Sequence, residues 1–581
     1  MSNASPAPPV LAIVPLALGA LSCASASGGG EAVSGGVFPS QREVERIENA
    51  PPPEAVFDAD LRQVDEWILE AAVPKRIDAR RWVERTPWGS FLGDVTTPTG
   101  GRVVPTKAMH CVASEIARFA LERGGRPDLS VRRFIIAACN ASVANVSFRS
   151  LQGEVGSSER DEEIFERWRD DSLSLVQDKI DSRQRSVVGI GFVRRGKRAA
   201  VYVASGRPLA EIERVETRLA RNEPFELRGR VLVPAISITA AINRGRYDVA
   251  PCEPVGHPTP PAFQFVCEPD PADESAWVSL SFTPPNRVLG KRALNALVWP
   301  NGGQTRAFRR FEYSSPRPIA DAALFAPAFL DELNQVRARA GLHPVALDAA
   351  QSATATRVAP HFFAAITGAT NERTADEAVL GLLAGWDVEG DIRSGSFTFG
   401  AVPETDDLAM LLAATLEEPL ARFTLLDPQT DRLAVGPILG EAGDTPVLAA
   451  VVTGYSLFDE GTKNADAEAL FTRLTAARHE RELPPPYRLV KVWLDAMHSA
   501  DEVRYGETPK HALDDLLQTS VTTLSREVLG WYRETSELGA FEFPEEMLSA
   551  PRLGTAIGVS HRKEPGEAWG RYVVLIVSVA H

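Results

Sequence analysis

Apolar side chains recur along this chain with two different spacings. Phe329, Leu330, Leu333 and Val336 follow steps of three and four residues, which predicts an amphipathic helix. Near-continuous apolar runs, such as residues 447–453, predict strands that are buried on both faces. Segments of these two kinds alternate over most of the chain. The pattern therefore predicts an α+β protein.

The same order of elements occurs three times. Each copy has an amphipathic helix, a turn that contains proline, further helices, a strand centred on glycine and a final apolar strand. The first helices are predicted at 111–123, 329–340 and 467–480, and the strand pairs at 187–193 with 199–204, 433–438 with 447–453, and 553–559 with 572–579. Strands with two buried faces need helices on both sides. Each copy is therefore predicted to be an α-β-α sandwich.

Between the first and second copies the pattern changes to short alternating runs separated by proline and glycine. Such runs with regular turn signals predict a small β-sandwich. Two further helices are predicted, an amphipathic one at 61–71 and a long one at 511–533. The predicted segments are a signal sequence at 1–26, a flexible linker at 27–58, a first module at 59–206, a β-rich segment at 207–316, a second module at 317–460 and a third module at 461–581.

Length and charge limit the possible functions. A chain of 581 residues exceeds what one hydrophobic core can hold, which agrees with several domains. The net charge of −15 argues against a nucleic-acid partner, because phosphate binding needs a basic face. Acidity of this size indicates solubility and does not identify a ligand.

The N-terminal residues predict export. Val10–Leu21 is an apolar stretch too short to span a bilayer, and small residues follow it, as in a secretory signal peptide. No Lys or Arg precedes the stretch, so a disordered tail is the alternative. Ala20–Cys23 resembles the lipobox of bacterial lipoproteins, in which Cys23 carries the lipid, whereas Ala24–Ala26 offers an ordinary cleavage site. Glycine and serine at residues 27–36 suit a flexible tether.

Four cysteines remain once Cys23 is assigned to the leader. They form two local pairs, Cys111 with Cys139 and Cys252 with Cys267. An even number of cysteines in close pairs is typical of an oxidising compartment, and each bridge would stabilise the fold by roughly 3 kcal/mol. The alternative is four buried thiols. With the leader, the cysteines predict two disulfides in an exported protein.

Two motifs in the second module resemble a known family. Leu333–Asp348 (LNQVRARAGLHPVALD) resembles the opening of bacterial CAP domains, the superfamily of cysteine-rich secretory, antigen 5 and pathogenesis-related proteins. Glu418–Pro428 (EPLARFTLLDP), followed by Leu433–Gly436 (LAVG), resembles the downstream motifs of that family. The resemblance covers residues 329–455 and implies an α-β-α sandwich. The first and third modules resemble the family only in their order of elements.

The resemblance also implies where a metal site would lie. The family's cleft typically holds two His and two Glu, a suitable ligand set for Zn²⁺. Here Ala421 stands at the position of the second His, and His361 lies near the position of the first. Glu372 and Glu404 are the nearby carboxylates. Because this set is incomplete, we expect no metal or other cofactor, and we expect His361 to be a packing residue.

Other chemistry has little support in the sequence. There is no nucleophile elbow, phosphate loop or metalloprotease motif. The glycine pairs Gly189–Gly191 and Gly554–Gly558 lie on strands, where close packing or a bulge is expected. The sequence thus favours a non-catalytic binding or scaffolding protein of the bacterial cell envelope, with an unidentified protein or envelope ligand and with membrane contact only through Cys23. The alternatives are a hydrolase of peptide or envelope polymer that uses His361 and Glu372, and a subunit of a larger surface assembly.

Overall fold

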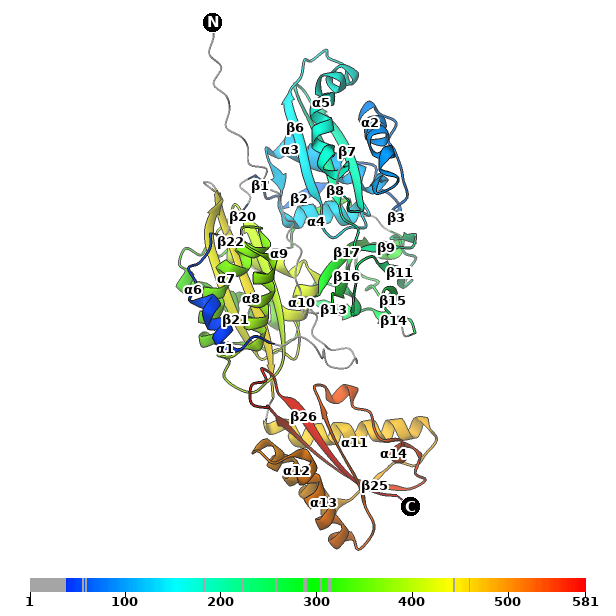
Figure 1. The fold of residues 1–581 in the computed structure, drawn as a ribbon, viewed down its shortest axis with the longest axis vertical. Coiled ribbons are helices and arrows are strands. Elements are labelled where there is room, and N and C mark those ends of the chain that lie inside the picture. The colour runs from blue at the N-terminus through cyan, green and yellow to red at the C-terminus, as the bar shows by residue number, and fades with distance from the viewer. Residues whose placement is uncertain are drawn as a thin grey trace.

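The computed structural model describes residues 38–54, 57, 60–180, 183–221, 223–256, 259–285, 290–302, 306–311, 315–442, 445–458 and 460–580. The predicted leader, Cys23 and the glycine–serine tether lie outside these residues. Helices and strands are mixed in several small sheets, so the α+β prediction is confirmed. Figure 1 shows an elongated molecule, with the first module at one end, the second module beside the β-rich segment in the middle and the third module at the other end. No helix in the described residues is long and apolar enough to cross a membrane.

Three four-stranded sheets share one strand order. In each, a short strand pairs in parallel with the first strand of a long hairpin, and a fourth strand pairs antiparallel with the second strand of that hairpin. The first module has β4 (Val103–Pro105), β7 (Ser186–Arg195), β8 (Arg198–Gly206) and β6 (Ser147–Glu154) in this order. The second module has β19 (Ala346–Leu347), β21 (Arg432–Ala442), β22 (Thr445–Leu457) and β20 (Ile392–Pro403). The third module has β23 (Tyr487–Arg488), β25 (Leu553–Arg562), β26 (Arg571–Ala580) and β24 (Leu529–Thr535).

Helices pack on both faces of these sheets. The first module has α2 (Pro87–Thr96), α3 (Lys107–Arg123), α4 (Leu129–Ala138) and α5 (Asp161–Ile180), and the second has α6 (Ala322–Arg339), α7 (Ala349–Ile366), α8 (Glu372–Ala384), α9 (Leu408–Leu416) and α10 (Pro419–Leu425). The third has α11 (Lys463–Glu480), α12 (Val490–Arg504), α13 (Pro509–Leu524) and α14 (Glu545–Ser549). Alternate side chains of one strand enter different clusters: Val187 packs with α3, whereas Val188 and Ile190 pack with α2 and α5. This alternation explains why the strands are apolar at nearly every position.

In each of the three modules a helix lies directly against a glycine of the first hairpin strand. A Cβ atom on any of these glycines would meet the helix backbone, so only glycine fits. The distances would be 2.2 Å from Gly191 to the Ser114 nitrogen, 2.2 Å from Gly436 to the Ala355 oxygen and 1.9 Å from Gly558 to the Ala496 oxygen. The strand glycines therefore serve close helix packing, one of the two roles expected from the sequence.

The β-rich segment contains two four-stranded antiparallel sheets. One holds β14 (Glu253–Pro254), β15 (Ala262–Cys267), β11 (Phe225–Val231) and β9 (Ala210–Ile212), and the other holds β13 (Asp248–Pro251), β12 (Ser237–Arg244), β16 (Ala276–Thr283) and β17 (Lys291–Val298), in these orders. Side chains from both sheets meet in one hydrophobic cluster. A disulfide joins Cys252 to Cys267 here, and a second joins Cys111 on α3 to Cys139 at the end of α4. Both predicted cysteine pairs are therefore confirmed.

The prediction of a helix at 61–71 is wrong. The chain there forms two short strands, β1 (Leu61–Arg62) and β2 (Glu66–Ile68). Trp67 and Leu69 are buried whereas Ile68 is exposed, an alternation that suits extended backbone. Three small sheets join distant segments: β1 pairs with β5 (Arg126–Pro127), β2 with β18 (Ala307–Arg309), and β3 (Arg76–Ile77) with β10 (Val215–Glu216).

Two further expectations need correction. The long helix predicted at 511–533 ends with α13 at Leu524, because Ser525 adopts a left-handed φ of 50° and the chain then forms β24. The helix at 111–123 was expected to correspond to those at 329–340 and 467–480. Instead α3 follows the short parallel strand β4, as α7 follows β19 and α12 follows β23. The short strands have only two or three residues, too few to leave a pattern in the sequence.

Part of the predicted linker is ordered. Helix α1 (Gln41–Glu48) begins with a capping box between Ser40 and Glu43 and buries Val44 and Ile47. It packs on α7 and α8 of the second module, as Figure 1 shows. We call residues 38–54 the N-terminal strap.

Candidate functional site

His361 lies in the core of the second module, beneath the N-terminal strap. Its side chain is 7% exposed on α7, and its ring hydrogen-bonds with the backbone of Ala50. Burial lowers the pKa of His361, because the charged ring would lose its hydration, and the hydrogen bond with Ala50 opposes this change. His361 is therefore neutral and inaccessible near pH 7.

Helix α3 of the first module corresponds to α7 and also has a buried ring at this position. His361 lies thirteen residues after the N-cap Asp348, and Phe119 lies thirteen residues after the N-cap Thr106. Phe119 is completely buried. The first module also contains a buried histidine, His110, whose pKa falls to about 4 because of burial. Buried neutral histidines are thus part of the packing in these modules.

The two candidate glutamates have different positions. Glu404 follows β20, and its Oε1 lies 3.2 Å from Nη1 of Arg62, while its Oε2 accepts a hydrogen bond of 2.9 Å from the Gln63 backbone. It therefore links the second module to the beginning of the first. Glu372 is the first residue of α8, after the N-cap Asn371. Among the residues that the structure describes, no cluster of three or more His, Cys, Asp or Glu side chains could hold a metal ion.

The segment that resembles the downstream family motif lies at a junction. Ala421 is buried, and Arg422 beside it is 3% exposed. The Arg422 guanidinium donates hydrogen bonds to the carbonyl oxygens of Leu416 at 2.8 Å, Gly245 at 3.1 Å and Asp248 at 3.0 Å. The last two residues belong to the β-rich segment. Arg422 therefore holds the second module against that segment.

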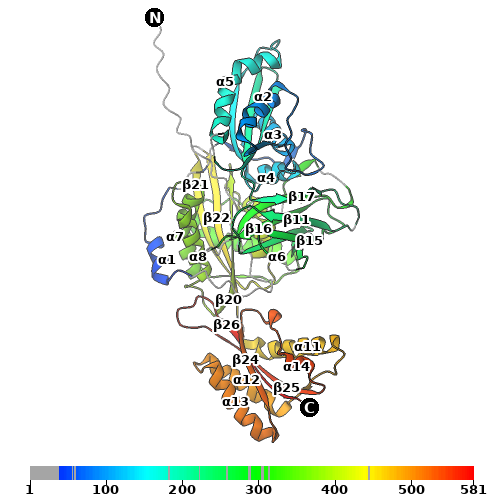
Figure 2. The same ribbon diagram turned by 45° about the vertical axis from the view of Figure 1, so that its right-hand side comes forward.

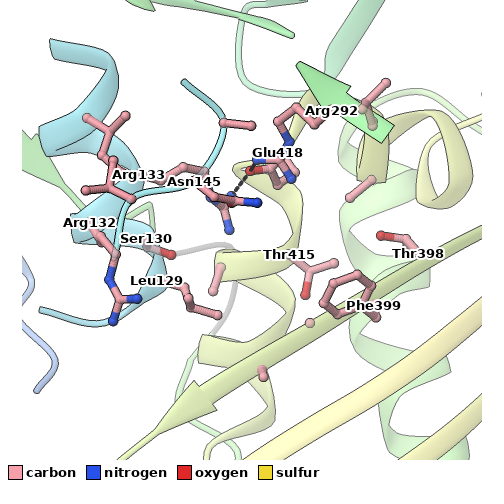
Figure 3. A pocket seen from close by; sticks show the side chains of 18 residues that line it. Leu129, Ser130, Arg132, Arg133, Asn145, Arg292, Thr398, Phe399, Thr415 and Glu418 are labelled. Atoms are coloured by element: carbon pink, nitrogen blue, oxygen red, sulfur yellow. Dashed lines mark hydrogen bonds and ion pairs between the residues drawn. The ribbon is translucent and has the colours of Figure 1, made fainter. Parts of the chain in front are cut away.

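A buried ionic cluster extends this junction to the first module. Glu418 forms ion pairs with Arg133 of α4 and with Arg292 of β17, the latter at 3.0 Å, and all three side chains are at least 80% buried. Figure 3 shows Arg133 reaching Glu418 from α4, with Arg292 above them. Burial lowers the pKa of Arg292, while the charge of Glu418 raises it. One carboxylate thus contacts arginines from two other segments.

A second ionic contact lies beside the first. Glu417 is buried next to Glu418, and burial raises its pKa, while the charge of Arg310 lowers it. Arg310 in turn forms a buried ion pair with Asp128, the N-cap residue of α4. The beginning of α4 is therefore held by charges from the second module and from the end of the β-rich segment.

The space that remains at this junction is a narrow crevice of about 60 Å³, enough for a few water molecules. Its walls come from α4, β17, β20, α9 and α10. Leu129 and Ile136 contribute from α4, and Phe399 and Thr415 from the second module (Figure 3). A crevice this narrow has no room for a polymer substrate.

Sequence reasoning did not identify the ionic junction. Its only sequence signal was the pair Glu417–Glu418 directly after the apolar segment Leu408–Leu416, where charges are unusual. The partners of Glu418 could not be assigned, because Arg292 is 126 positions away in the sequence. Charged residues placed in a buried segment predict that partners exist, and the tertiary fold decides which ones.

The chain has only distant similarity to known proteins. No family model and no curated protein matches the chain. Among solved structures, it is similar to a cysteine-rich secretory protein from Staphylococcus aureus subsp. aureus Mu50, with 11% identity, coverage of 42% of this chain and 88% of that chain, and a TM-score of 0.18. It is also similar to an extracellular protein containing an SCP domain from Bacillus anthracis str. Ames, with 12% identity, coverage of 43% and 86%, and a TM-score of 0.17. Both TM-scores are far below 0.5, and the fold is defined by its own strand pairing and layers.

Proposed function

We propose that this protein is an exported, non-catalytic scaffolding or binding protein of a bacterial cell envelope, attached to lipid at Cys23. The observation that carries the proposal is the ionic junction of Glu418, Arg133 and Arg292. The family resemblance would place a metal-binding histidine at Ala421, close to this junction. Instead, that region joins three segments of the chain into one body.

The energetics of buried charge support this role. Moving a charged side chain out of water costs several kcal/mol, and an ion pair recovers that cost only with good geometry. Each charge of such a pair is destabilising without its partner, so the pair disfavours arrangements in which the partners are separated. A metal site at the family's second histidine position, Ala421, would need an open cleft here, whereas α4 of the first module covers this place. The arrangement is suited to holding modules in fixed positions.

We further propose that the three modules are related CAP-like units and that the β-rich segment is a β-sandwich between the first two. A pair of buried arginines supports the relation between the second and third modules. Arg337 donates from Nε to the carbonyl of His343, and Arg478 donates from Nε to the carbonyl of Pro484, in both cases six residues further along the chain. The other guanidinium nitrogens bind carbonyls within or just after a distant short helix, at Leu425 and Asp427 for Arg337 and at Met547 and Ala550 for Arg478.

Export is supported by the two disulfides. Structural disulfides persist in oxidising compartments and are rare in the reducing cytosol. The Cys111–Cys139 bridge ties together two helices of the first module, and the Cys252–Cys267 bridge lies within the β-rich segment. Together with the predicted signal peptide, they favour a location outside the cytoplasmic membrane.

The proposal is tested by replacing His361 with phenylalanine in the full-length protein. Phe119 fills the corresponding position of the first module, so we expect His361→Phe to fold normally while removing any ligand or catalytic group. Metal content is measured by mass spectrometry, and release of soluble fragments from isolated peptidoglycan and from casein is measured for both proteins. We expect no stoichiometric metal and no fragment release from either. Stoichiometric metal or hydrolysis in the wild type, lost in His361→Phe, would overturn the proposal in favour of a hydrolase.

A further inference from the structure

The third module carries an unusual share of exposed apolar side chains. Of the thirteen large apolar residues exposed in the described parts of the chain, seven lie in this module. The most exposed are Val490 at 73%, Leu494 at 74% and Tyr505 at 82%, all on α12 or at its C-cap. Exposed apolar residues are ordinary when scattered, but grouped ones mark a contact surface.

These three residues lie on one side of the helix, where the polar residues His498 and Asp501 stand between Leu494 and Tyr505. Successive residues of an α-helix are rotated by about 100°, which places Val490, Leu494 and Tyr505 within about 60° of one another around the axis. At about 1.5 Å per residue they extend over roughly 22 Å. We call Val490, Leu494 and Tyr505 the α12 stripe. Its opposite side packs on β25 through residues such as Ala496.

The fold itself does not require apolar residues at these positions. Val490 and Leu494 lie one and five residues after the N-cap of α12, and Ala349 and Ala353 occupy the same positions on α7. Both alanines are exposed as well. The second module therefore has small side chains where the third has large apolar ones, so the stripe is not explained by packing within the module.

The C-terminal end of the stripe lies near the point where the described chain begins. Arg504, next to Tyr505, lies 3.8 Å from Asp391 of the second module. The neighbouring Ile392 accepts a hydrogen bond of 2.9 Å from Gly570, and Trp569 packs against Phe38 with ring centroids 5.1 Å apart. The strap thus starts at the same junction between the second and third modules. Fifteen Cα–Cα steps separate Phe38 from Cys23, a span of at most about 54 Å.

We propose that the α12 stripe contacts the lipid surface in which Cys23 is anchored. This proposal rests on the lipid attachment included in the proposed function. The connection from Cys23 to Phe38 limits the distance of the junction from the membrane to the span of these residues, so the stripe can reach the lipid surface. Val490 and Leu494 enter the boundary between headgroups and acyl chains, and the Tyr505 ring lies at headgroup level. The net charge of −15 means that apolar contact, rather than attraction to anionic lipid, provides this second point of attachment.

A fluorescent label on the stripe tests the proposal in the lipidated, full-length protein. His498 lies between Leu494 and Tyr505 and its side chain is 78% exposed, so His498→Cys gives a labelling site on the same side of the helix. The native cysteines do not compete, because four are in disulfides and Cys23 would carry the lipid. An environment-sensitive dye is attached, and the protein is reconstituted into vesicles of phosphatidylethanolamine and phosphatidylglycerol. Ile236→Cys, an exposed apolar position of the β-rich segment, is the matched control.

We expect the emission of the dye on His498→Cys to shift to shorter wavelength on the vesicles and to be quenched by brominated lipid. The control label should do neither. Adding Val490→Glu and Leu494→Glu should abolish the shift while the protein stays bound through its lipid. A label on the stripe that remains as exposed to water as the control would overturn the proposal. A shift that grows with protein concentration without vesicles would also overturn it, since a second copy then covers the stripe.

The anchor is checked separately by intact mass and by flotation of the protein with vesicles. Protein that carries no lipid and does not float refutes the anchor at Cys23, and the stripe proposal falls with it. Protein that floats while the stripe label remains in water refutes the stripe alone. The two failures are therefore distinguishable.

Discussion

At the scale of single residues, the distance between helix and sheet depends on glycine, which has no side chain. Gly436 faces the backbone of Ala355, and the nearest atom to a Cβ there would be the Ala355 carbonyl oxygen at 2.2 Å. Real Cβ atoms do not approach backbone this closely, so either the helix or the strand would have to move. Gly558 and Ala496 repeat the arrangement in the third module. These contacts set the separation of the layers.

We expect Gly436→Ala to destabilise the second module by roughly 3 kcal/mol, because the added methyl group overpacks a rigid contact. Gly440→Ala is the matched control on the same strand, since its Cβ would meet nothing closer than 3.7 Å. Thermal unfolding followed by calorimetry measures both variants. Equal unfolding temperatures for the two variants would show that α7 can shift without cost, contrary to the close packing described here.

At the scale of elements, the N-terminal strap determines the environment of His361. Val44 is 3% exposed and packs on Gly381 of α8, and Arg357 of α7 forms an ion pair of 2.8 Å with Glu48. The Trp386 indole donates a hydrogen bond of 3.2 Å to the carbonyl of Pro39. The strap is therefore held along its length, and it excludes water from the His361 ring.

We expect Val44→Asp to detach the strap, because the buried carboxylate has no partner, and to raise the pKa of His361 toward its ordinary value. Burial lowers this pKa and favours the neutral ring, and this effect outweighs the opposing hydrogen bond with Ala50. The contribution of the buried neutral His361 ring to strap stability is complete above the unfolded pKa of about 6.5. This contribution decreases as the pH falls below that value. Titration of the His361 ring by NMR measures the shift, with Arg46→Ala on the exposed side of α1 as control. An unchanged pKa in Val44→Asp would contradict this account.

Long amphipathic and apolar segments were predictable from the sequence because each carries a periodic pattern. The hairpin strands of the first module lie within a few residues of their predicted positions, 187–193 and 199–204. Strand β24 was assigned to a helix because its side chains are half exposed on both faces and leave no alternation. The parallel strand β19 has only two residues, below the length at which any period is visible.

The candidate site was predictable only in part. The sequence predicted that His361 packs rather than binds, because the family's ligand set is incomplete here, and that stays a prediction; the structure buries the side chain. The sequence did not indicate that the strap would cover His361, since Ala50 lay in a segment expected to be a flexible linker. Contacts between residues so far apart in the sequence depend on the tertiary fold and leave no local signal.

At the scale of the whole molecule, the modules are held in an elongated arrangement by small junctions (Figure 2). The first and second modules meet at Glu418, and the second and third meet near Asp391, where His561 lies 3.2 Å away. The junction at Glu418 is sensitive to the loss of any one of its charged groups, because a buried charge without a partner is costly.

We expect Glu418→Ala to loosen the contact between the first and second modules, since Arg133 and Arg292 lose their shared carboxylate. Removing one member of a buried ion pair costs roughly 3–5 kcal/mol. Small-angle X-ray scattering should show a larger radius of gyration, and limited proteolysis should cut near the junction sooner. Glu441→Ala, at an exposed position of β21, serves as control. Scattering identical to the wild type would show that the ionic junction does not hold the modules together.

The position of the strap has a consequence for the order in which the protein is made. Val44 and Ile47 are synthesised early, but Gly381 and the rest of α8 follow more than three hundred residues later. Domains usually fold in the order of synthesis, from the N-terminus onward. Here α1 has no surface to fold against until most of the chain has been made and, in an exported protein, translocated. One of the first described segments to be synthesised can therefore dock only after α7 and α8 have been made.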